Sequence, residues 1–337
     1  MTADDATGHE THMRTAIEAA SRSRLLSPPN PWVGAVLVSP DGQVFVGSTQ
    51  RPGANHAERE VLDRAGAASA GATLYSTLEP CSHHGRTSPC TNAIITAGIT
   101  TVVYAVDDPD PQVAGSGAAH LEAAGIRVVA GVLAAEVEVQ LAPYLHHRRT
   151  GRPYVVLKMA ATLDGRTAAV DGSSQWITSP EARADAHLLR AESDAILVGA
   201  GTVRDDDPRL TIRGIVASDG GPVREPLRVV LGSAPPDAAV HPCLELGGEL
   251  VTILDELGSR GLVQLMVEGG AQVAGSFHRA GLVDRYVIYL APALMGGDDG
   301  RGIFAGPGAG TIDDVFRGAI VGARSVGVDL RVDLHPR

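Results

Sequence analysis

His56-Ala57-Glu58 begins the most informative stretch of this chain, which continues to Pro80-Cys81 and Pro89-Cys90. One imidazole and two thiolates form a net-neutral set of three ligands for Zn²⁺, and they leave the fourth tetrahedral position for water. Glu58, two residues after His56, cannot share its helical face, so we expect the carboxylate to lie beside that open position. The pattern predicts a zinc site formed by the histidine and the two cysteines.

A site of this kind is suited to hydrolytic deamination. Bound zinc lowers the pKa of its water to roughly 7, and the resulting hydroxide attacks an amidine-like ring carbon. A carboxylate carries protons from the nucleophile to the leaving amine, and the pattern assigns this role to Glu58. We therefore predict that the first half of the chain removes an amino group from a ring.

The competing interpretation is a closed structural zinc site. Such sites usually show four ligands in two short pairs, whereas eight residues separate Cys81 from Cys90. His83 and His84 follow Cys81 closely and could supply a fourth ligand. Loop histidines more often contact solvent or substrate, so the catalytic interpretation is favoured and both histidines are left outside the metal shell.

Length and composition restrict the remaining possibilities. A chain of 337 residues exceeds what one hydrophobic core usually organises, so two domains are expected. The formal charge of −11 argues against general electrostatic binding to nucleic-acid phosphates and favours a small-molecule substrate. Three cysteines, two of them in the zinc motif, are typical of a reduced, cytoplasmic protein. Because no apolar run reaches membrane length, we expect no membrane partner, and the acidic charge predicts no nucleic-acid partner.

Lys158 stands out because it is the only lysine among the 28 lysines and arginines of the chain. Arginine keeps its proton in proteins, whereas the pKa of a lysine can move, so a lone lysine is a candidate for a role that arginine cannot perform. The competing explanation is an accident of composition at a surface position. Composition alone favours that explanation.

The first half alternates helix and strand patterns. In chain order they predict a helix around residues 13–20, a β-hairpin of residues 33–38 and 44–47, a helix at 57–64, a strand at 73–76, a helix at 91–97 and a strand at 101–106. This order indicates a layered α/β domain whose sheet lies between helices. We expect Cys81 and Cys90 at helix N-termini, where the partial positive charge favours a thiolate.

A basic stretch punctuated by proline and glycine, residues 145–153, is interpreted as a linker, so the predicted domains are residues 1–147 and 152–337. The second half is predicted to contain strands at 154–160, 194–198, 227–231 and 263–267, helices after Ser179, at 249–257 and from Gly269-Gly270, and a last long strand at 284–290. Ser179 is a suitable N-cap because Pro180 follows at the first helical position. The second domain is therefore expected to be α/β as well.

Val267-Glu268-Gly269-Gly270 places two glycines where a buried strand turns into a helix. Free backbone N–H groups at such a junction could face a phosphate, although a tight turn explains the glycines equally well. The segment is not the Gly-x-Gly-x-x-Gly fingerprint. A nicotinamide cofactor bound here would indicate a fold other than the Rossmann domain.

Further motifs cover nearly the whole chain. In the first half they are Pro29-Asn30-Pro31-x-Val33-Gly34, His56-Ala57-Glu58, Glu79-Pro80-Cys81-x-x-x-Gly85-Arg86-Thr87-x-Pro89-Cys90 and Asp108-Pro109. In the second half they are Lys158-Met159-Ala160-x-x-Leu163-Asp164-Gly165, Ser174-Gln175-Trp176-Ile177-Thr178, Leu189-Arg190, Asp206-Asp207-Pro208-x-Leu210-Thr211 and Glu268-Gly269-Gly270. With these motifs the chain resembles the bifunctional riboflavin-biosynthesis family, in which a diaminohydroxyphosphoribosylaminopyrimidine deaminase is fused to a 5-amino-6-(5-phosphoribosylamino)uracil reductase.

The resemblance implies a cytidine-deaminase-like three-layer α/β/α domain followed by a dihydrofolate-reductase-like α/β domain. The first domain, a hydrolase of cyclic amidines with Zn²⁺, would exchange the 2-amino group of 2,5-diamino-6-(5-phosphoribosylamino)pyrimidin-4(3H)-one for oxygen. The second domain, an NADPH-dependent oxidoreductase, would reduce the ribosyl group of 5-amino-6-(5-phosphoribosylamino)uracil to ribityl. The resemblance also implies a homo-oligomer.

Site residues follow from the resemblance position by position. In the first half zinc would be held by His56, Cys81 and Cys90, protons would be carried by Glu58, and the substrate would be positioned by Asn30 and Arg86. Lys158 matches the family's lysine beside the reaction centre, which reverses the preference for an accident of composition. NADPH contacts are expected from Ala160, Trp176, Thr202, Asp206, Ser233, Gly270, Ala271, Gln272, Val273, Ala274, Gly275 and Ser276. The phosphosugar would be held by Ser174, Arg190, Leu210, Arg213 and Glu268.

The chain departs from the family pattern in three places. Thr49 stands where the family often has a substrate-contacting histidine. Asp110 replaces the usual asparagine after Asp108-Pro109, and its charge would be unfavourable near a phosphorylated substrate unless it points away. The segment between Leu231 and Glu249 is shorter than is usual in the family, so a peripheral strand near Ser233 could be missing.

Two other functions are compatible with parts of the sequence. One is a nucleoside or guanine-type deaminase whose second domain has lost reduction, and the intact lysine and Glu268-Gly269-Gly270 motifs speak against it. The other is a non-catalytic nucleotide-binding or regulatory protein with structural zinc. Deaminase turnover by a Glu58→Gln variant that keeps its zinc would distinguish the catalytic from the structural interpretation.

Overall fold

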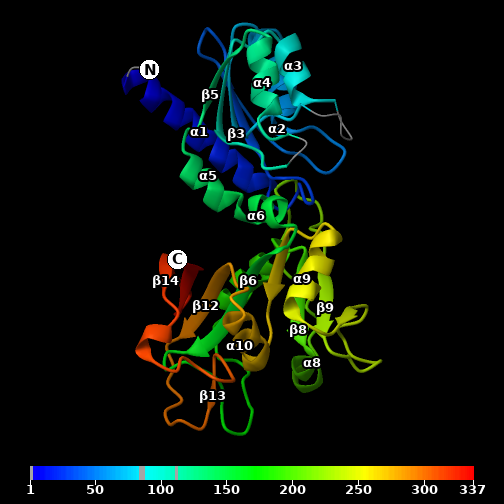
Figure 1. Cartoon of the computed structure of the whole chain (residues 1–337), viewed down its shortest axis with the longest axis vertical. Coiled ribbons are helices and arrows are strands. Elements are labelled where there is room, and N and C mark those ends of the chain that lie inside the picture. The colour runs from blue at the N-terminus through cyan, green and yellow to red at the C-terminus, as the bar shows by residue number, and fades with distance from the viewer. Residues whose placement is uncertain (1–2, 83–87, 111–112) are drawn as a thin grey trace. The chain divides into compact units, whose positions relative to one another are not determined.

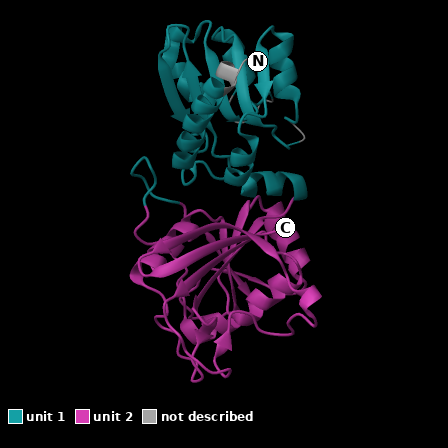
Figure 2. Cartoon of the chain, turned by 90° about the vertical axis from the view of Figure 1, so that its left-hand side faces the viewer, with its two compact units in different colours: residues 1–150, 216–223 teal, residues 151–215, 224–337 magenta. Residues whose placement is uncertain are grey.

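The computed structural model (Figure 1) describes residues 3–82, 88–110 and 113–337. The chain divides into two compact units: unit 1 comprises Met1–Thr150 and Val216–Val223, and unit 2 comprises Gly151–Ile215 and Arg224–Arg337 (Figure 2). The stretch interpreted as a linker is not a loop, because helix α6 (Ala142–Thr150) occupies most of it. The basic residues that suggested a linker lie in the last turn of this helix, where positive charge is favourable.

Unit 1 contains a five-stranded sheet with the strand order β2-β1-β3-β4-β5. Its strands are β1 (Gly34–Val38), β2 (Val44–Ser48), β3 (Thr73–Leu78), β4 (Thr101–Val106) and β5 (Arg127–Ala130). The described helices are α1 (Ala3–Ser23), α2 (Ala57–Ala65), α3 (Cys90–Thr96), α4 (Ser116–Ala123), α5 (Ala134–Gln140) and α6, with a 3₁₀ turn at Gly66–Ser69. Every element that the sequence predicted before residue 107 is present.

Two glycines show that helices cover both faces of this sheet (Figure 1). A Cβ atom on Gly34 would lie 1.9 Å from the carbonyl oxygen of Ala16, so α1 lies directly on that face of β1. Gly47 faces the opposite side, because it pairs with Ala35, the neighbour of Gly34. A Cβ atom on Gly47 would lie 2.7 Å from the side chain of Glu60 in α2. Unit 1 is therefore the predicted three-layer α/β/α arrangement.

Unit 2 contains an eight-stranded sheet with the order β10-β9-β8-β11-β6-β12-β15-β14. Its strands are β6 (Tyr154–Thr162), β8 (Ala195–Gly199), β9 (Leu227–Leu231), β10 (Leu244–Leu246), β11 (Gln264–Val267), β12 (Arg285–Ala291), β14 (Gly318–Val326) and β15 (Asp329–Pro336). The helices are α7 (Pro180–Ala191), α8 (Ala200–Asp206), α9 (Leu250–Ser259) and α10 (Ala271–Arg279). A small second sheet pairs β7 (Arg166–Ala168) with β13 (Arg301–Gly302), and Ile312–Asp314 forms a 3₁₀ turn.

The strands from β10 to β12 in that order run parallel. Leu157 of β6 and Leu197 of β8 share a buried core cluster with Phe277 of helix α10. Ser179 caps α7 as predicted, because its side chain accepts a hydrogen bond from the backbone N–H of Ala182. Among the described helices, none is long and apolar enough to cross a membrane.

The prediction that residues 284–290 form the last strand was wrong. Two more strands, β14 and β15, extend the sheet as an antiparallel hairpin. Their pattern escaped detection because it is inverted: Asp329, Arg331 and Asp333 are buried, whereas Leu330 is 40% exposed. Residues 231–249 do retain a peripheral strand, the three-residue β10, which pairs in parallel with β9.

Candidate active sites

The three predicted zinc ligands of unit 1 meet beyond the end of strand β3. His56 is the N-cap residue of α2, Cys81 lies in the loop after β3, and Cys90 is the first residue of α3. Nδ1 of His56 lies 3.7 Å from Sγ of Cys81 and 3.4 Å from Sγ of Cys90. All three donor atoms lie within 4.8 Å of one another.

These separations fit a tetrahedral zinc ion. With Zn–S near 2.3 Å and Zn–N near 2.0–2.1 Å, a tetrahedral angle places a sulfur and a nitrogen about 3.6 Å apart. Among the described residues, the cluster contains no fourth protein donor. His83 and His84, considered as further ligands, lie outside the described residues. The donor set therefore suits Zn²⁺ with one position left for a small molecule.

Only one of the two cysteines begins a helix, so the prediction for Cys81 was wrong. Its sulfur nevertheless reaches the N-terminus of α3, because it accepts a hydrogen bond from the backbone N–H of Cys90 at 3.4 Å. The hydrogen bond between the two cysteine side chains lowers the pKa of Cys81 to about 4 and raises the pKa of Cys90. One thiolate is thus already favoured at this site.

Glu58 lies in the first turn of α2 and is only 4% exposed. Its Oε2 accepts a hydrogen bond from Sγ of Cys90 at 3.6 Å, yet Glu58 is not a member of the ligand cluster. Burial, followed by the charge of Cys81, raises the pKa of Glu58 to about 7. A carboxyl group with such a pKa can both accept and release a proton near neutrality.

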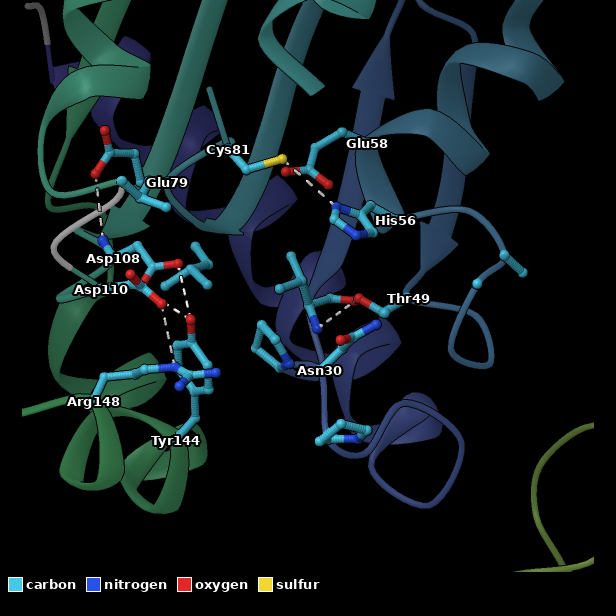
Figure 3. A pocket seen from close by; sticks show the side chains of 17 residues that line it. Asn30, Thr49, His56, Glu58, Glu79, Cys81, Asp108, Asp110, Tyr144 and Arg148 are labelled. Carbon is cyan, nitrogen blue, oxygen red and sulfur yellow. Dashed lines mark hydrogen bonds and ion pairs between the residues drawn. The ribbon is translucent and has the colours of Figure 1, made fainter. Parts of the chain in front are cut away.

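A pocket of about 320 Å³ opens at the ligand cluster (Figure 3). Asn30 lines it together with His56 and Glu58, which is where a residue that positions a ring is needed. Thr49 also lines the pocket and is buried. Its hydroxyl accepts a hydrogen bond from the backbone N–H of Val33 at 3.1 Å. Arg86, predicted to hold the substrate, lies outside the described residues.

The sequence analysis missed a second wall of this pocket, formed by helix α6 (Figure 3). Tyr144 donates a hydrogen bond to the carboxylate of Asp108, with both oxygens 3.0 Å away. Nε of Arg148 lies 3.5 Å from Oδ2 of Asp110, so the unusual carboxylate is paired. The spacing of Tyr144 and Arg148, four residues apart on one helix face, was the signal available in the sequence.

In unit 2 the half-buried carboxylate of Glu268 pairs with predicted residues from two other elements. Nζ of Lys158 in β6 lies 3.2 Å from Oε1 of Glu268, which follows β11. Nε of Arg190 in α7 lies 2.8 Å from Oε2 of the same residue. Burial alone would raise the pKa of Glu268, but the charges of Lys158 and Arg190 lower it to about 2. The cluster therefore holds one anion between two cations.

Two neighbours extend this cluster. Nζ of Lys158 lies 5.9 Å from the ring centroid of Tyr289 in β12, whose hydroxyl donates to Asp185 at 2.6 Å. The sequence analysis missed Tyr289, because an aromatic residue in a strand pattern indicates only a core position. After burial, the charges of Arg190 and Arg213 lower the pKa of His187. Nη1 of Arg190 donates a hydrogen bond at 3.2 Å to the carbonyl oxygen of Thr211, in the segment that carries Arg213.

The predicted cofactor residues lie mostly where strands turn into helices. The backbone N–H of Gly270, the N-cap residue of α10, donates to the hydroxyl of Thr202 in α8 at 3.3 Å. Along α10, Ala271 and Val273 are half-buried, Gln272 and Ser276 are exposed, and Ala274 and Gly275 are buried. Gly275 packs so closely that a Cβ atom would lie 2.3 Å from the carbonyl oxygen of Ala305.

The remaining predicted residues are distributed over unit 2. Ala160 is half-buried in β6, Ser233 is exposed after β9, and Asp206 is exposed at the end of α8. Trp176 is 70% exposed, with the guanidinium of Arg183 4.6 Å from its ring centroid, so it is not a core residue. Ser174 is half-buried, whereas Leu210 is only 3% exposed and has a positive φ of 52°. Within the described parts of the chain, the carboxylate of Glu268 pairs with Lys158 and Arg190 and not with these residues.

Comparison with known proteins identifies both halves of the chain. The cytidine and deoxycytidylate deaminase zinc-binding region matches residues 6–106, and the RibD C-terminal domain matches residues 153–330. The riboflavin biosynthesis protein RibD of Escherichia coli K12 is 40% identical over 96% of this chain and 98% of its own length.

Two solved structures agree with this result and confirm the predicted fold class. Acinetobacter baumannii RibD, form 2, has a TM-score of 0.91 and 33% identity, with 99% of this chain and 100% of that chain covered. A diaminohydroxyphosphoribosylaminopyrimidine deaminase/5-amino-6-(5-phosphoribosylamino)uracil reductase from Thermotoga maritima has a TM-score of 0.86 and 31% identity, with 99% and 100% covered. The chain therefore belongs to the RibD family of riboflavin biosynthesis proteins, bifunctional enzymes that join a deaminase to a reductase.

Proposed function

We propose that this chain catalyses two consecutive steps of riboflavin biosynthesis. The first is hydrolytic deamination of 2,5-diamino-6-(5-phosphoribosylamino)pyrimidin-4(3H)-one. The second is NADPH-dependent reduction of the ribosyl group of 5-amino-6-(5-phosphoribosylamino)uracil to ribityl. The observation that carries the proposal is the convergence of His56, Cys81 and Cys90 at zinc-binding separations with Glu58 beside them.

In unit 1, His56, Cys81 and Cys90 would hold the zinc ion, which would lower the pKa of a water molecule and so supply the nucleophile. Glu58 would accept a proton from the attacking water and donate one to the leaving amino group, as its pKa of about 7 permits. Asn30, on the pocket wall, would orient the pyrimidine ring. Arg86 would hold the phosphoribosyl group, since a guanidinium can bind a phosphate with two hydrogen bonds.

In unit 2, Glu268 would hold Lys158 and Arg190 in fixed positions around the sugar. Reduction at C1′ with opening of the ribose ring requires a proton on the ring oxygen, and Lys158 would provide the hydrogen bond or the proton. Arg190 and Arg213 would bind the phosphate, because a guanidinium can bind a phosphate with two hydrogen bonds and Arg190 is hydrogen-bonded to Thr211, two residues before Arg213. Ser174 and the backbone of Leu210 would complete the phosphosugar site.

NADPH would supply the hydride and would bind along the helix starts beside this cluster. Thr202 and Gly270, joined by a hydrogen bond, would contact it together with Ala160 and the α10 residues that reach solvent. Ala274 and Gly275 would contribute by allowing close packing of α10, because both are buried in the protein. We assign further contacts with NADPH to Trp176, Asp206 and Ser233 on the resemblance to the family.

An assay of the purified chain with each substrate tests both halves separately. Ammonia release from the diaminopyrimidinone should need zinc but no NADPH. NADPH oxidation should begin only when the deaminated product is formed or supplied. Failure to reduce the supplied intermediate would exclude the reductase half, and comparable ammonia release from cytidine or guanine would favour the nucleoside-deaminase alternative.

We also propose that the protein is a cytoplasmic homo-oligomer that binds no nucleic acid. All three cysteines are free, which suits a reducing compartment. The net charge of −11 opposes binding to phosphate backbones. Sedimentation velocity of the full chain would measure the oligomeric state, and a sedimentation coefficient of a monomer at micromolar concentration would contradict the proposal.

A further inference from the structure

A second cluster of metal-ligand side chains lies in unit 2, and neither proposed reaction uses it. It consists of His241, Cys243 and Glu245, whose donor atoms all lie within 4.8 Å of one another. Cys243 and Glu245, two residues apart where the chain enters β10, share one face. His241 precedes them across a bend at Pro242. Cys243 is the one cysteine outside the first zinc motif, and its thiol is free.

The separation between two of the donors matches that of the first site. Nδ1 of His241 lies 3.5 Å from Sγ of Cys243, between the two nitrogen–sulfur distances measured around His56. A tetrahedral zinc ion needs about 3.6 Å between such donors. The imidazole and the thiol are therefore already at ligand spacing.

Hydrogen bonds orient two of the three ligands. Nε2 of His241 lies 2.9 Å from the carbonyl oxygen of Pro235, which can only accept, so this nitrogen carries the proton and Nδ1 keeps its lone pair toward Cys243. Metal-bound histidines usually donate their second N–H to a carbonyl or carboxylate in this way. Oε1 of Glu245 accepts the backbone N–H of Ala234 at 3.0 Å, which holds the carboxylate beside the other donors.

A neighbouring cation, Arg228, binds the backbone and not these ligands. Arg228 in β9 donates to the carbonyl oxygens of Val240 and His241, at 3.3 and 3.2 Å, through the same nitrogen. Its guanidinium therefore secures the backbone of the loop while the Glu245 carboxylate stays available. A thiolate and a carboxylate together would neutralise a divalent cation.

We propose that His241, Cys243 and Glu245 bind a second Zn²⁺ ion. Imidazole, thiolate and carboxylate are all ligands of zinc, and sulfur disfavours magnesium and calcium. The ion ties the loop before β10 to the edge of the sheet. His241 and Cys243 are half-buried and Glu245 is exposed, so this ion exchanges with solvent more readily than the ion of the first site.

The chain has only three cysteines, so each site can be isolated by substitution. Equilibrium dialysis of the full chain against Zn²⁺, followed by elemental analysis, should give two zinc ions per wild-type chain. Cys243→Ser should give one, held by the first site. A Cys81→Ser, Cys90→Ser double variant should also give one, and with Co²⁺ as probe it should show a sulfur-to-cobalt absorption band that the further change Cys243→Ser removes.

A matched pair of variants tests the carboxylate. Glu245→Gln should weaken zinc binding at the second site at least about tenfold, a loss typical even of groups that only orient a ligand. Glu249→Gln, at the exposed N-cap position of α9, should leave it unchanged. Circular dichroism checks that each variant is folded. If Cys243→Ser or Glu245→Gln does not fold, zinc binding is measured on His241→Gln, which removes another ligand of the same site. One zinc ion per wild-type chain overturns the proposal. A second ion that survives substitution of Cys243, His241 and Glu245 also overturns it, because that ion is adventitious.

Discussion

Lys158 and Glu268 form an ion pair in which Nζ of the lysine lies 3.2 Å from Oε1 of the glutamate. The other oxygen of Glu268, Oε2, accepts a hydrogen bond from Nε of Arg190 at 2.8 Å. A single carboxylate thus connects strand β6 to helix α7, and both of its oxygens are paired. The only lysine of the chain is held by this pair at the centre of the proposed reductase site.

Lys158→Ala is expected to lower the rate of reduction by about 10²–10⁴-fold, because the alanine side chain can donate neither a hydrogen bond nor a proton to the sugar. Ammonia release should continue at the wild-type rate, because the zinc ligands belong to unit 1. Lys158→Arg is the matched control, since it keeps the charge beside Glu268 without the compact ammonium group. Both activities are measured on one preparation, and equal loss of both would indicate damaged folding instead.

Glu58→Gln is expected to lower deamination by about 10²–10⁴-fold, because an amide cannot exchange protons with the substrate. Zinc content should stay unchanged, since Glu58 lies outside the ligand cluster. Elemental analysis and ammonia release test this together, with reduction of the supplied intermediate as control. Persistent turnover by the zinc-loaded variant would show that another group carries the proton.

Glu79→Ala is expected to destabilise unit 1 by roughly 3 kcal/mol or more, because unpaired buried N–H groups cost about 1–3 kcal/mol each. The Glu79 carboxylate is 2% exposed and accepts four backbone N–H groups, from Asp108, Gly115, Gly117 and Ala118, at 2.9–3.3 Å. The same substitution should raise the KM of deamination, because Asp108 lines the pocket.

Urea unfolding followed by tryptophan fluorescence measures this loss. Trp32 is buried in unit 1 and dominates the signal, since Trp176 in unit 2 is already 70% exposed. Glu122→Ala, at an exposed position of α4, is the control and should leave the free energy of unfolding within about 0.5 kcal/mol. A similar value for the Glu79 variant would contradict the assigned role.

Glu268 should make unit 2 sensitive to acid. Its pKa is lowered from 4.5 to about 2, so its ionised form stabilises the folded state above pH 4.5 and this stabilisation is lost as the pH falls from 4.5 toward 2. The contribution at neutral pH is on the order of 3 kcal/mol. The difference in unfolding free energy between the wild type and Glu268→Gln should shrink over this pH range. A difference that stays constant would count against the shifted pKa.

Asp110→Asn is expected to lower the KM of deamination up to about fivefold. The carboxylate pairs with Arg148 at the pocket wall, and its removal takes away one negative charge that opposes the attraction of the arginine for the substrate phosphate. Pairs at such partly exposed positions contribute at most about 1 kcal/mol. The gain should fade at high salt because the attraction is screened, and Arg148→Gln should change KM in the opposite direction.

Local patterns were sufficient to predict the elements of unit 1 before residue 107 and to single out a candidate set of zinc ligands, but they did not predict α4, β5, α5 or α6. His56, Cys81 and Cys90 lie within 35 residues, at a helix start, after a strand and at the next helix start, so spacing alone nearly determines their meeting. The same patterns took residues 145–150 for part of a linker, because the charged end of α6 has the composition of a loop. The division between the two units, after Thr150, nevertheless lies within the predicted stretch. They also missed β15, because its charges point inward and reverse the usual alternation.

The amino-acid pattern alone established two α/β domains, a zinc-ligand set and a lone lysine that needed a role. Folding in three dimensions decided what surrounds them. It formed the α6 wall of the pocket, paired Asp110 with Arg148, and brought the carboxylate of Glu268 to Lys158, 110 residues earlier in the sequence, and to Arg190. The physical reason is that helix and strand periods act over a few residues. Which buried charges become neighbours depends on sheet register and helix packing between distant segments.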